Sequence, residues 1–517
     1  MCSISGVTWS DRPVVNTMNK KQHNRGPDGS GILEESSYTL GHTLLAINSD
    51  DGIQPLRGQG SLTFNGQIYD CPWQDKLDSE WLLEKLDAEG YEFLENTNGM
   101  WAFAYVRENL LYLVRDHFGA KPLYYSVVEG GLIFASTIPA LLESGIVDKT
   151  FCNNNINTLE QGNYWQSGEI TPYLNIRKVP PGGVYVWDLN KKDFVQKTSL
   201  WKGFSIAEKS DYNHFEFRKK VIEAVDKVGN TKRDLSILLS GGLDSTLVCG
   251  ILSKLEKDFT AYTLAYENNG SLGKRAKPLE DEVRLAKLTA KHFKVPHIVR
   301  AFPECQTFID DLKIETLQAA GNVFEDNYRM MPRFLLLEEV NNFGGKVVLT
   351  GDGGDEIFTG YQLHRIWLEE GMPTPKEVSA FMDQVDLHPW FPMNTVKGAD
   401  AATALMFMKL LTQCETYLLR LDAFGGHNGL EVRVPLLYQD LVKYSMRIPL
   451  KVKLKYEDSD YKGINKYLIR EVFADIIPDN IRYRGQKVGW SLPWWRHDMK
   501  LQRKRKKSDR DLLKGLV

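Results

Sequence analysis

The sequence predicts an α+β domain followed by an α/β domain. Three observations predict this order. The chain has 517 residues, enough to bury two cores. Short apolar or alternating runs between turn signals fill roughly the first 200 residues, and apolar strands alternate with amphipathic helices beyond them. We therefore expect domains over residues 2–200 and 210–500 and a basic tail over 501–517.

The expected strands of the first domain follow one another closely. Few convincing helices separate them, which favours packed antiparallel sheets. A polar connector at Trp201–Asn213 marks the change to the second domain. The expected strands are Ser61–Phe64, Met100–Arg107, Leu110–Arg115, Gly131–Ala135 and Gly183–Leu189.

Strand–helix alternation in the second domain predicts a parallel sheet with helices on both faces. Strands are expected at Ser236–Leu239, Thr260–Ala265 and Lys346–Thr350, and helices at Thr246–Lys254 and Asp281–Phe293. Ligands bind such sheets at the carboxyl ends of the strands, so the chemistry is expected in the turns there.

The composition of the chain argues against a nucleic-acid-binding, membrane or secreted protein. A net charge of −3 and a pI of about 6.4 favour neither nucleic acid nor an anionic membrane as a partner. No apolar stretch approaches the ~20 residues of a transmembrane helix, and the first residues lack the features of a signal peptide. Six scattered cysteines without a Cys-x-x-Cys pair indicate reduced thiols. We therefore expect a cytoplasmic protein.

Cys2 directly follows Met1. Removal of Met1, which a small second residue permits, would leave a cysteine with both a thiol and a free α-amine. Such an amine can act as the general base for its own side chain. A cysteine at this position is most often incidental, so the pattern gains weight only from its neighbours.

Asn65 and Gly66 close the expected strand that begins at Ser61. An asparagine amide and a glycine N–H are suitable donors to the oxyanion that forms when a thiolate attacks an amide. The ordinary explanation of an Asn-Gly pair is a type I′ hairpin turn. On these residues alone both explanations stay open.

The most specific pattern in the chain is Leu-Leu-Ser-Gly-Gly-Leu-Asp-Ser at Leu238–Ser245. Its glycines let backbone N–H groups approach a phosphate, and the helix that follows adds the positive end of its dipole. Ser240 supplies a hydroxyl donor, and Asp244 is placed to hold Mg²⁺. No Gly-Lys-Ser/Thr follows, so it is not a Walker-type loop. The alternative is a helix N-cap whose glycines serve packing.

A second glycine-rich turn, Leu349–Tyr361, follows the expected strand at 346–350. It places the carboxylates of Asp352, Asp355 and Glu356 among glycines, a pattern that suits a metal or a general base. A solvent-exposed acidic turn is the alternative explanation.

Motifs from both halves occur in the order of one known family. The first half contains Met-Cys-Ser-Ile-x-Gly, Arg-Gly-Pro-Asp-x-x-Gly, Asn-Gly-x-Ile-Tyr, Arg-Asp-x-x-Gly-x-Lys-Pro-Leu-Tyr-Tyr and Phe-Ala-Ser. The second contains Ser-Gly-Gly-x-Asp-Ser, a signature of ATP pyrophosphatases, then Gly-Asp-Gly-x-Asp-Glu-x-Phe-x-Gly-Tyr and Glu-x-Arg-Val-Pro. The chain therefore resembles the glutamine-hydrolysing asparagine synthetases nearly to its end. That resemblance implies an Ntn-hydrolase-like αββα sandwich followed by an adenine-nucleotide α-hydrolase-like domain.

The resemblance implies that the first domain is a type 2 glutamine amidotransferase. Cys2 would be the nucleophile that releases ammonia from glutamine. Asn65 and Gly66 would form the oxyanion hole, and Asp78 would bind the α-amine of glutamine.

In the second domain the resemblance implies a synthetase that uses ATP and Mg²⁺ to amidate aspartate through a β-aspartyl-AMP. Asp244 and Asp355 would share Mg²⁺. Asp352 would accept a proton from attacking ammonia, and Lys487 would neutralise phosphate charge. The residues expected to bind ATP and pyrophosphate are Ser240, Gly241, Gly242, Leu243, Asp244 and Ser245.

Two positions of the first domain depart from the family pattern, and in the second domain Tyr438 stands where the family usually has an aspartate. Leu44 stands where the family has an arginine that clamps the α-carboxylate of glutamine, and Gln67 replaces a glutamate. Leucine cannot replace a bidentate arginine contact. Either another cation, such as Arg25 or Arg57, takes that role or glutamine binds poorly.

Three functions remain on the sequence alone. The first is glutamine-dependent asparagine synthesis; the second is a related synthetase that adenylates a different carboxylate or uses free ammonia. The third is a non-catalytic ATP-binding relic, against which the intact loop at 240–245 counts. The oligomeric state stays open, a homodimer included.

Overall fold

The structure is a computed structural model, and it describes most of the chain. The described residues are 1–48, 52–72, 76–152, 155, 168–207, 212–267, 276–303, 305–320, 327–361, 363–364, 367, 371–385, 393–454 and 465–484. Lys487 and the expected basic tail at 501–517 lie outside them. None of the described helices combines the length and the apolar character that crossing a bilayer demands.

The first domain is built from two six-stranded antiparallel sheets, as the density of short strands predicts. One sheet has the order β10(Arg177–Lys178)-β8(Tyr124–Val128)-β9(Gly131–Ala135)-β1(Ser3–Val7)-β3(Thr39–Leu44)-β2(Gly29–Glu34). The other has the order β12(Asp193–Ser199)-β11(Gly183–Asp188)-β7(Leu110–Arg115)-β6(Gly99–Arg107)-β5(Ser61–Ile68)-β4(Leu56–Arg57).

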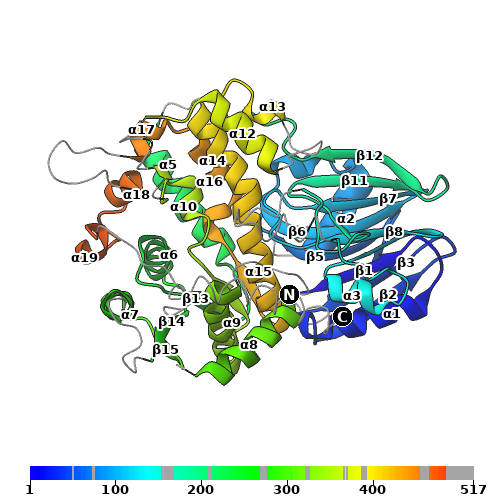
Figure 1. Ribbon diagram of the computed structural model, residues 1–517, viewed down its shortest axis with the longest axis horizontal. Coiled ribbons are helices and arrows are strands. Elements are labelled where there is room, and N and C mark those ends of the chain that lie inside the picture. Colours follow the sequence, from blue (N-terminus) through cyan, green and yellow to red (C-terminus); the bar gives the residue numbers. More distant parts are fainter. Residues whose placement is uncertain are drawn as a thin grey trace.

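Strand β6 shows why the sheets form a sandwich. Its odd-numbered residues Trp101 and Phe103 pack outward beneath α2 (Asp78–Glu89), while Ala102 and Ala104 face the other sheet. Successive side chains point to opposite faces of a strand, so a strand buried on both faces is apolar throughout. Helices α1 (Arg12–Lys21) and α3 (Ile138–Glu143) cover the outer face of the first sheet. The layers are therefore helix, sheet, sheet, helix (Figure 1).

The second domain has a five-stranded parallel sheet, which confirms the expected alternation. Its order is β15(His297–Phe302)-β14(Thr260–Tyr266)-β13(Leu235–Leu238)-β16(Val347–Leu349)-β17(Glu431–Arg433). Helices α6 (Leu243–Lys254) and α7 (Ala276–Phe293) lie on one side of it, and α8 (Gln306–Ala320) and α9 (Asn327–Asn342) on the other (Figure 1). The strand order reverses at β13, so the carboxyl ends of β13 and β16 form the crevice where such sheets bind ligands.

The remaining described helices extend the second domain around this sheet. Helix α15 (Glu415–His427) continues α14 (Ala401–Lys409) through a π-helical turn at Leu410–Cys414 and lies beside the amino terminus (Figure 1). The others are α5 (His214–Val228), α10 (Gly354–Ile357), α12 (Pro375–Val385), α13 (Met393–Val396), α16 (Gln439–Arg447), α17 (Leu450–Lys453), α18 (Tyr467–Val472) and α19 (Asp479–Arg482).

Three local expectations differ from the structure. Asn65 and Gly66 lie inside β5 and not in a hairpin turn, because the strand runs on to Ile68 and pairs with β6 throughout. Helix α7 begins at Ala276, five residues before the expected Asp281. The connector after Trp201 is not simply polar, since the Trp201 ring is fully buried against Phe407 at a centroid distance of 5.1 Å.

Candidate active site

Cys2 lies immediately before β1, at the boundary between the domains. The Leu45 N–H points to its Sγ at 3.4 Å. Burial raises the pKa of the Cys2 thiol, and the nearby terminal amine offsets part of that rise. The α-amine of Met1 is itself buried and donates to the Leu430 carbonyl at 3.3 Å. Burial lowers the pKa of the Met1 amine to about 4, so this amine is neutral at pH 7.

Asn65 and Gly66 have the features of an oxyanion site. The Asn65 side chain is 1% exposed, and neither its amide oxygen nor its nitrogen has a hydrogen-bond partner among the described residues. Buried polar groups are almost always paired, so an orphaned amide points to a ligand. Gly66 has a φ of +154°, and a Cβ there would lie 2.1 Å from the Met100 carbonyl oxygen. Only glycine fits this close approach to β6.

Asp78 begins α2, but part of its binding capacity is already used. Gln67 Nε2 donates to Asp78 Oδ2 at 2.8 Å, and the Ile68 N–H donates to the same oxygen at 3.2 Å. Burial raises the pKa of Asp78 to about 7, although the Ile68 N–H opposes the rise. Asp78 is therefore only partly ionised at neutral pH, and glutamine's ammonium would have to compete with the Gln67 amide.

The wall near Asp78 is apolar where the family has its arginine. A Cβ built on Gly52 would lie 3.5 Å from Leu77 Cδ1 and 3.7 Å from Leu44 Cδ1, so these three residues adjoin. The two arginines that could replace the family's arginine are both engaged in ion pairs. Arg25 is buried in an ion pair with Asp422 at 2.7 Å, and Arg57 is exposed and pairs with Glu35 at 2.8 Å.

The pyrophosphate loop joins β13 to α6 as its sequence predicts. The Ser240 and Ser245 hydroxyls lie 3.1 Å apart, and Ser240 Oγ accepts from the Gly242 N–H at 3.3 Å. Gly241 has a φ of +69°, and a Cβ there would lie 2.4 Å from the Glu282 carbonyl oxygen. Helix α6 has no side-chain cap at its N-terminus. Its first N–H groups and its dipole therefore remain for an anion.

The second glycine-rich turn packs directly against this loop. A Cβ on Gly351 would lie 2.7 Å from the Ser245 backbone nitrogen, and one on Gly354 would lie 2.5 Å from Asp244 Oδ1. Since β13 and β16 are parallel neighbours, both turns leave the same edge of the sheet. The two motifs, more than 100 residues apart in the sequence, thus form one site.

Lys466 completes this site, and the sequence interpretation missed it. Its ammonium forms ion pairs with both Asp244 and Asp355. Burial opposes a charge on Lys466, but the two carboxylates outweigh burial and raise its pKa. No spacing or composition signal marks this lysine, which precedes α18 and lies 222 residues from Asp244 in the chain.

The other carboxylates of the turn have partners. Asp352 makes a bidentate ion pair with Arg333, at 2.9 Å and 3.1 Å. The arginine fork engages both carboxylate oxygens, so Asp352 must leave Arg333 before these oxygens can contact another group. Glu356 is buried and accepts from the Tyr361 hydroxyl, and burial raises its pKa to about 7.

Asp244 and Asp355 fit the magnesium site that the sequence predicts. Asp244 Oδ1 is buried with no hydrogen-bond partner among the described residues, and the Lys466 ammonium shows that a cation is accommodated between the two carboxylates. No group of three or more His, Cys, Asp or Glu side chains in the described part of the chain could hold a metal alone. Mg²⁺ commonly takes one or two carboxylates together with substrate phosphates.

Arg433 links the two halves of the site. Its Nη2 donates to Gln67 Oε1 at 3.1 Å and its Nε to Glu431 at 2.8 Å, while its carbonyl accepts from the Thr350 N–H at 3.1 Å. The sequence predicts no role at the site for Arg433, which belongs to the Glu-x-Arg-Val-Pro motif. The structure instead connects it to Gln67, beside Asp78, and to Thr350, which opens the second turn.

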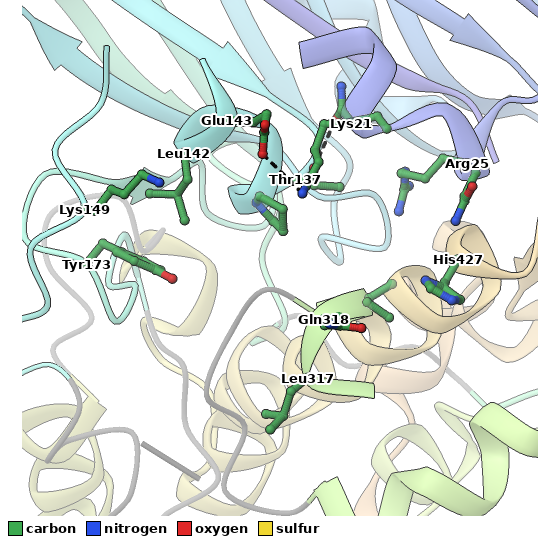
Figure 2. A pocket seen from close by; sticks show the side chains of 15 residues that line it. Lys21, Arg25, Thr137, Leu142, Glu143, Lys149, Tyr173, Leu317, Gln318 and His427 are labelled. Atoms are coloured by element: carbon green, nitrogen blue, oxygen red, sulfur yellow. Dashed lines mark hydrogen bonds and ion pairs between the residues drawn. The ribbon is translucent and has the colours of Figure 1, made fainter. Parts of the chain in front are cut away.

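Apolar side chains of both domains form one continuous cluster at the boundary. Cys2 packs against this cluster, which includes Leu45 and Met100 from the first domain and Leu405 and Leu436 from the second. A cavity of about 430 Å³ opens elsewhere along the boundary, with Arg25 and His427 on its opposite walls (Figure 2).

Both halves of the chain match known protein families. The asparagine synthase family matches residues 216–514, and the glutamine amidotransferase domain matches residues 1–201. The chain is 29% identical over 414 residues to putative glutamine-hydrolyzing asparagine synthetase 2 of Methanocaldococcus jannaschii, covering 70% of this chain and 76% of that protein. It is 25% identical over 536 residues to glutamine-hydrolyzing asparagine synthetase B of Escherichia coli K12, covering 95% and 83%. It is 29% identical over 380 residues to amidase chyE of Penicillium rubens, covering 66% and 54%.

Proposed function

This chain belongs to the asparagine synthase family, and from that premise we propose that it converts aspartate to asparagine with ATP, using ammonia released from glutamine at Cys2. The main support for this proposal is that Asp244, Asp355 and Lys466 lie together beside the N-terminus of α6, where the N-cap residue Gly242 has no capping side chain. This arrangement combines anion-binding amides, a buried cation and two carboxylates, the groups that activation of a carboxylate by ATP requires.

In the proposed reaction the β-carboxylate of aspartate attacks the α-phosphorus of ATP and pyrophosphate leaves. Ser240–Ser245 and the helix N-terminus hold the pyrophosphate, and Lys466 and Lys487 balance its charge. Ammonia then attacks the β-aspartyl-AMP, AMP leaves, and Asp352 takes the surplus proton. Asp352 can do so once its ion pair with Arg333 opens.

Mg²⁺ fits this proposal through Asp244 and Asp355. When bound, it would neutralise phosphate charge as pyrophosphate departs. The protein's own contribution is to hold both carboxylates at one edge of the sheet, which the glycines at 351 and 354 permit.

The first domain supplies ammonia in this proposal. We take it to be an Ntn-hydrolase-like sandwich, and the second domain to be adenine-nucleotide α-hydrolase-like. Once Met1 is removed, the Cys2 amine takes the thiol proton and the thiolate attacks the side-chain amide of glutamine. The C–N bond then breaks, ammonia leaves with the proton that the amine returns, and water hydrolyses the resulting thioester to glutamate and free Cys2. The orphaned Asn65 amide and Gly66 N–H stabilise the oxyanion. The apolar cluster beside Cys2 offers ammonia a route shielded from water.

The proposed boundaries remain residues 2–200 and 210–500, with the tail at 501–517. We also propose that the protein works in the cytoplasm, because its six cysteines are unpaired, as a reducing compartment requires.

The test is ATP–pyrophosphate exchange with aspartate and Mg²⁺, followed by asparagine assays with glutamine or ammonium as the nitrogen source. Aspartate-dependent exchange and asparagine from both sources are expected. Exchange that does not depend on aspartate would contradict the proposed acceptor.

A second candidate is a related synthetase that adenylates another carboxylate or uses free ammonia. The apolar wall at Leu44 and the bond between Gln67 and Asp78 favour the use of free ammonia, because both weaken the binding of glutamine. Synthesis from ammonium but not from glutamine would support this part of the second candidate.

A further inference from the structure

The amino terminus of the first domain is held by a carboxylate of the second. Asp422, on α15, lies 2.7 Å from Arg25 Nη2 and 3.5 Å from Lys121 Nζ. The three side chains are between 1% and 5% exposed. Neither Asp422 carboxylate oxygen has an aligned hydrogen-bond donor in the described parts of the chain, so charge is the main attraction.

Arg25 contacts the residue that carries the nucleophile, and Lys121 contacts the residue before it. Arg25 Nε donates to the Cys2 carbonyl at 3.4 Å. Lys121 Nζ lies 2.7 Å from the Met1 sulfur. Since the Lys121 contact is lost when Met1 is removed, Asp422 acts on the Cys2 backbone through Arg25.

A second cluster on the same helix offers a comparison. Glu415, seven residues before Asp422 and so on the same helix face, lies 2.6 Å from Arg115 and 2.8 Å from Lys178. All three side chains are at most 1% exposed. Arg115 also donates to the carbonyls of three residues of its own domain, Gly119, Lys121 and Val179. In the described part of the chain, the ion pairs of this cluster join the domains through Arg115 and Lys178 and involve neither Met1 nor Cys2.

The two clusters thus differ in their contacts: the Asp422 cluster reaches the Cys2 carbonyl, and the Glu415 cluster reaches other carbonyls of the first domain. Loss of a buried carboxylate leaves its cations uncompensated, and such cations move toward water. A shift of Arg25 would release the Cys2 carbonyl. A misplacement of about 1 Å between reacting groups can cost about 100-fold in rate.

We propose that Asp422 is a positioning residue for Cys2, so that the glutaminase geometry is completed only when the synthetase domain is docked. The inference rests on the proposed role of Cys2. It assigns to a residue of the second domain a part in the chemistry of the first, with Arg25 as the link between them.

The test compares four full-length variants by glutamate release from glutamine. Asp422→Asn keeps the side-chain volume and removes the charge; Asp422→Glu keeps the charge and moves the carboxylate. Glu415→Gln and Glu415→Asp are the matched controls at the other cluster. The kcat for glutamine is expected to fall about 30-fold or more in Asp422→Asn and about tenfold in Asp422→Glu, with KM changed less than threefold. The Glu415 variants are expected to stay within threefold of the wild type.

Alkylation of Cys2 by iodoacetamide, read by mass spectrometry of the amino-terminal peptide, gives a second measurement that needs no glutamine. Its rate is expected to change in the Asp422 variants and not in the Glu415 variants. Ammonium-dependent synthesis and thermal unfolding check that the second domain and the fold are intact. Because Asp422→Glu keeps the ion pairs balanced, it remains informative if Asp422→Asn does not fold.

Equal losses in the Asp422 and Glu415 variants would overturn the proposal, since they would indicate domain docking alone. Wild-type glutamate release and Cys2 alkylation in Asp422→Glu would overturn it as well. If the wild-type protein itself releases no glutamate, the proposed use of glutamine fails, and the alkylation rates still decide the role of Asp422.

Discussion

Gln67 Nε2 donates a hydrogen bond to Asp78 Oδ2 at 2.8 Å. A neutral amide thus lies against the carboxylate expected to bind glutamine's ammonium. The side-chain oxygen of Gln67, Oε1, accepts from Asn48 at 2.8 Å and from Arg433 at 3.1 Å. Arg433 therefore connects Gln67 and Asp78, at the amide-hydrolysing site, to the second domain by hydrogen bonds.

The raised pKa of Asp78 predicts a pH dependence of glutamine use. Ionised Asp78 attracts the ammonium of glutamine and protonated Asp78 does not. Since its pKa is about 7, kcat/KM for glutamine should rise with pH up to about 7 and fall about tenfold per pH unit below it. Initial rates of glutamate release between pH 5.5 and 8.5 measure this. In Asp78→Asn, kcat/KM for glutamine should be low and should not change with pH below about 7. If this variant keeps the wild-type pH dependence, another group causes the titration.

Leu44→Arg should improve glutamine binding. The new guanidinium can pair with the α-carboxylate, and a hydrogen bond to a charged group contributes about 1.5–3 kcal/mol. We expect the KM for glutamine to fall about tenfold, as measured by steady-state glutamate release. Leu44→Met, which adds no charge, is the control. A similar KM in both variants would mean that position 44 does not face the carboxylate.

Asn65→Ala should separate catalysis from stability. The buried Asn65 amide has no partner in the described residues, so its removal leaves no other group unsatisfied. Loss of an oxyanion donor lowers kcat by about 100- to 1,000-fold. We expect that loss in glutamate release together with an unchanged or higher melting temperature. A large drop in melting temperature would instead show that Asn65 has a structural partner.

Lys466→Met should abolish ATP–pyrophosphate exchange and destabilise the second domain. Removal of the lysine leaves the buried Asp244 and the partly exposed Asp355 as adjacent carboxylates without the cation that they share. Breaking a buried ion pair costs about 3–5 kcal/mol. Mg²⁺ should restore part of that stability, because it can take the place of the ammonium between the carboxylates. Thermal unfolding with and without Mg²⁺ measures this, and Lys451→Met, a substitution of an exposed lysine, is the control. An equal response to Mg²⁺ in both variants would argue against a metal at this site.

The two half-reactions should separate by mutation. Cys2→Ala should abolish asparagine formation from glutamine and leave formation from ammonium intact. Asp244→Ala and Lys487→Ala should abolish both, because each removes a group from the ATP-dependent step. Asparagine assays with each nitrogen source provide the measurement. Loss of the ammonium reaction in Cys2→Ala would contradict this division of labour.

Local sequence patterns were enough to predict individual strands, helices and loops of this protein. The loop at 240–245 could be recognised because a buried strand, a serine–glycine turn and a helix follow one another without interruption. Strand β6 could be recognised for a related reason, since its whole length is apolar and turns bound it. In both cases neighbouring residues in the chain provide the signal.

Contacts between residues far apart in the chain could be found only from the packing of the folded protein. Lys466 reaches Asp244 across 222 positions, and Asp422 reaches Arg25 across 397. The sequence left a hairpin turn and an oxyanion site both open for Asn65 and Gly66, and pairing with β6 holds them inside a strand. An isolated lysine or aspartate carries no spacing signal, because its partner is set by the packing of sheets and domains. The charged partners of both sites were therefore outside the reach of the sequence pattern.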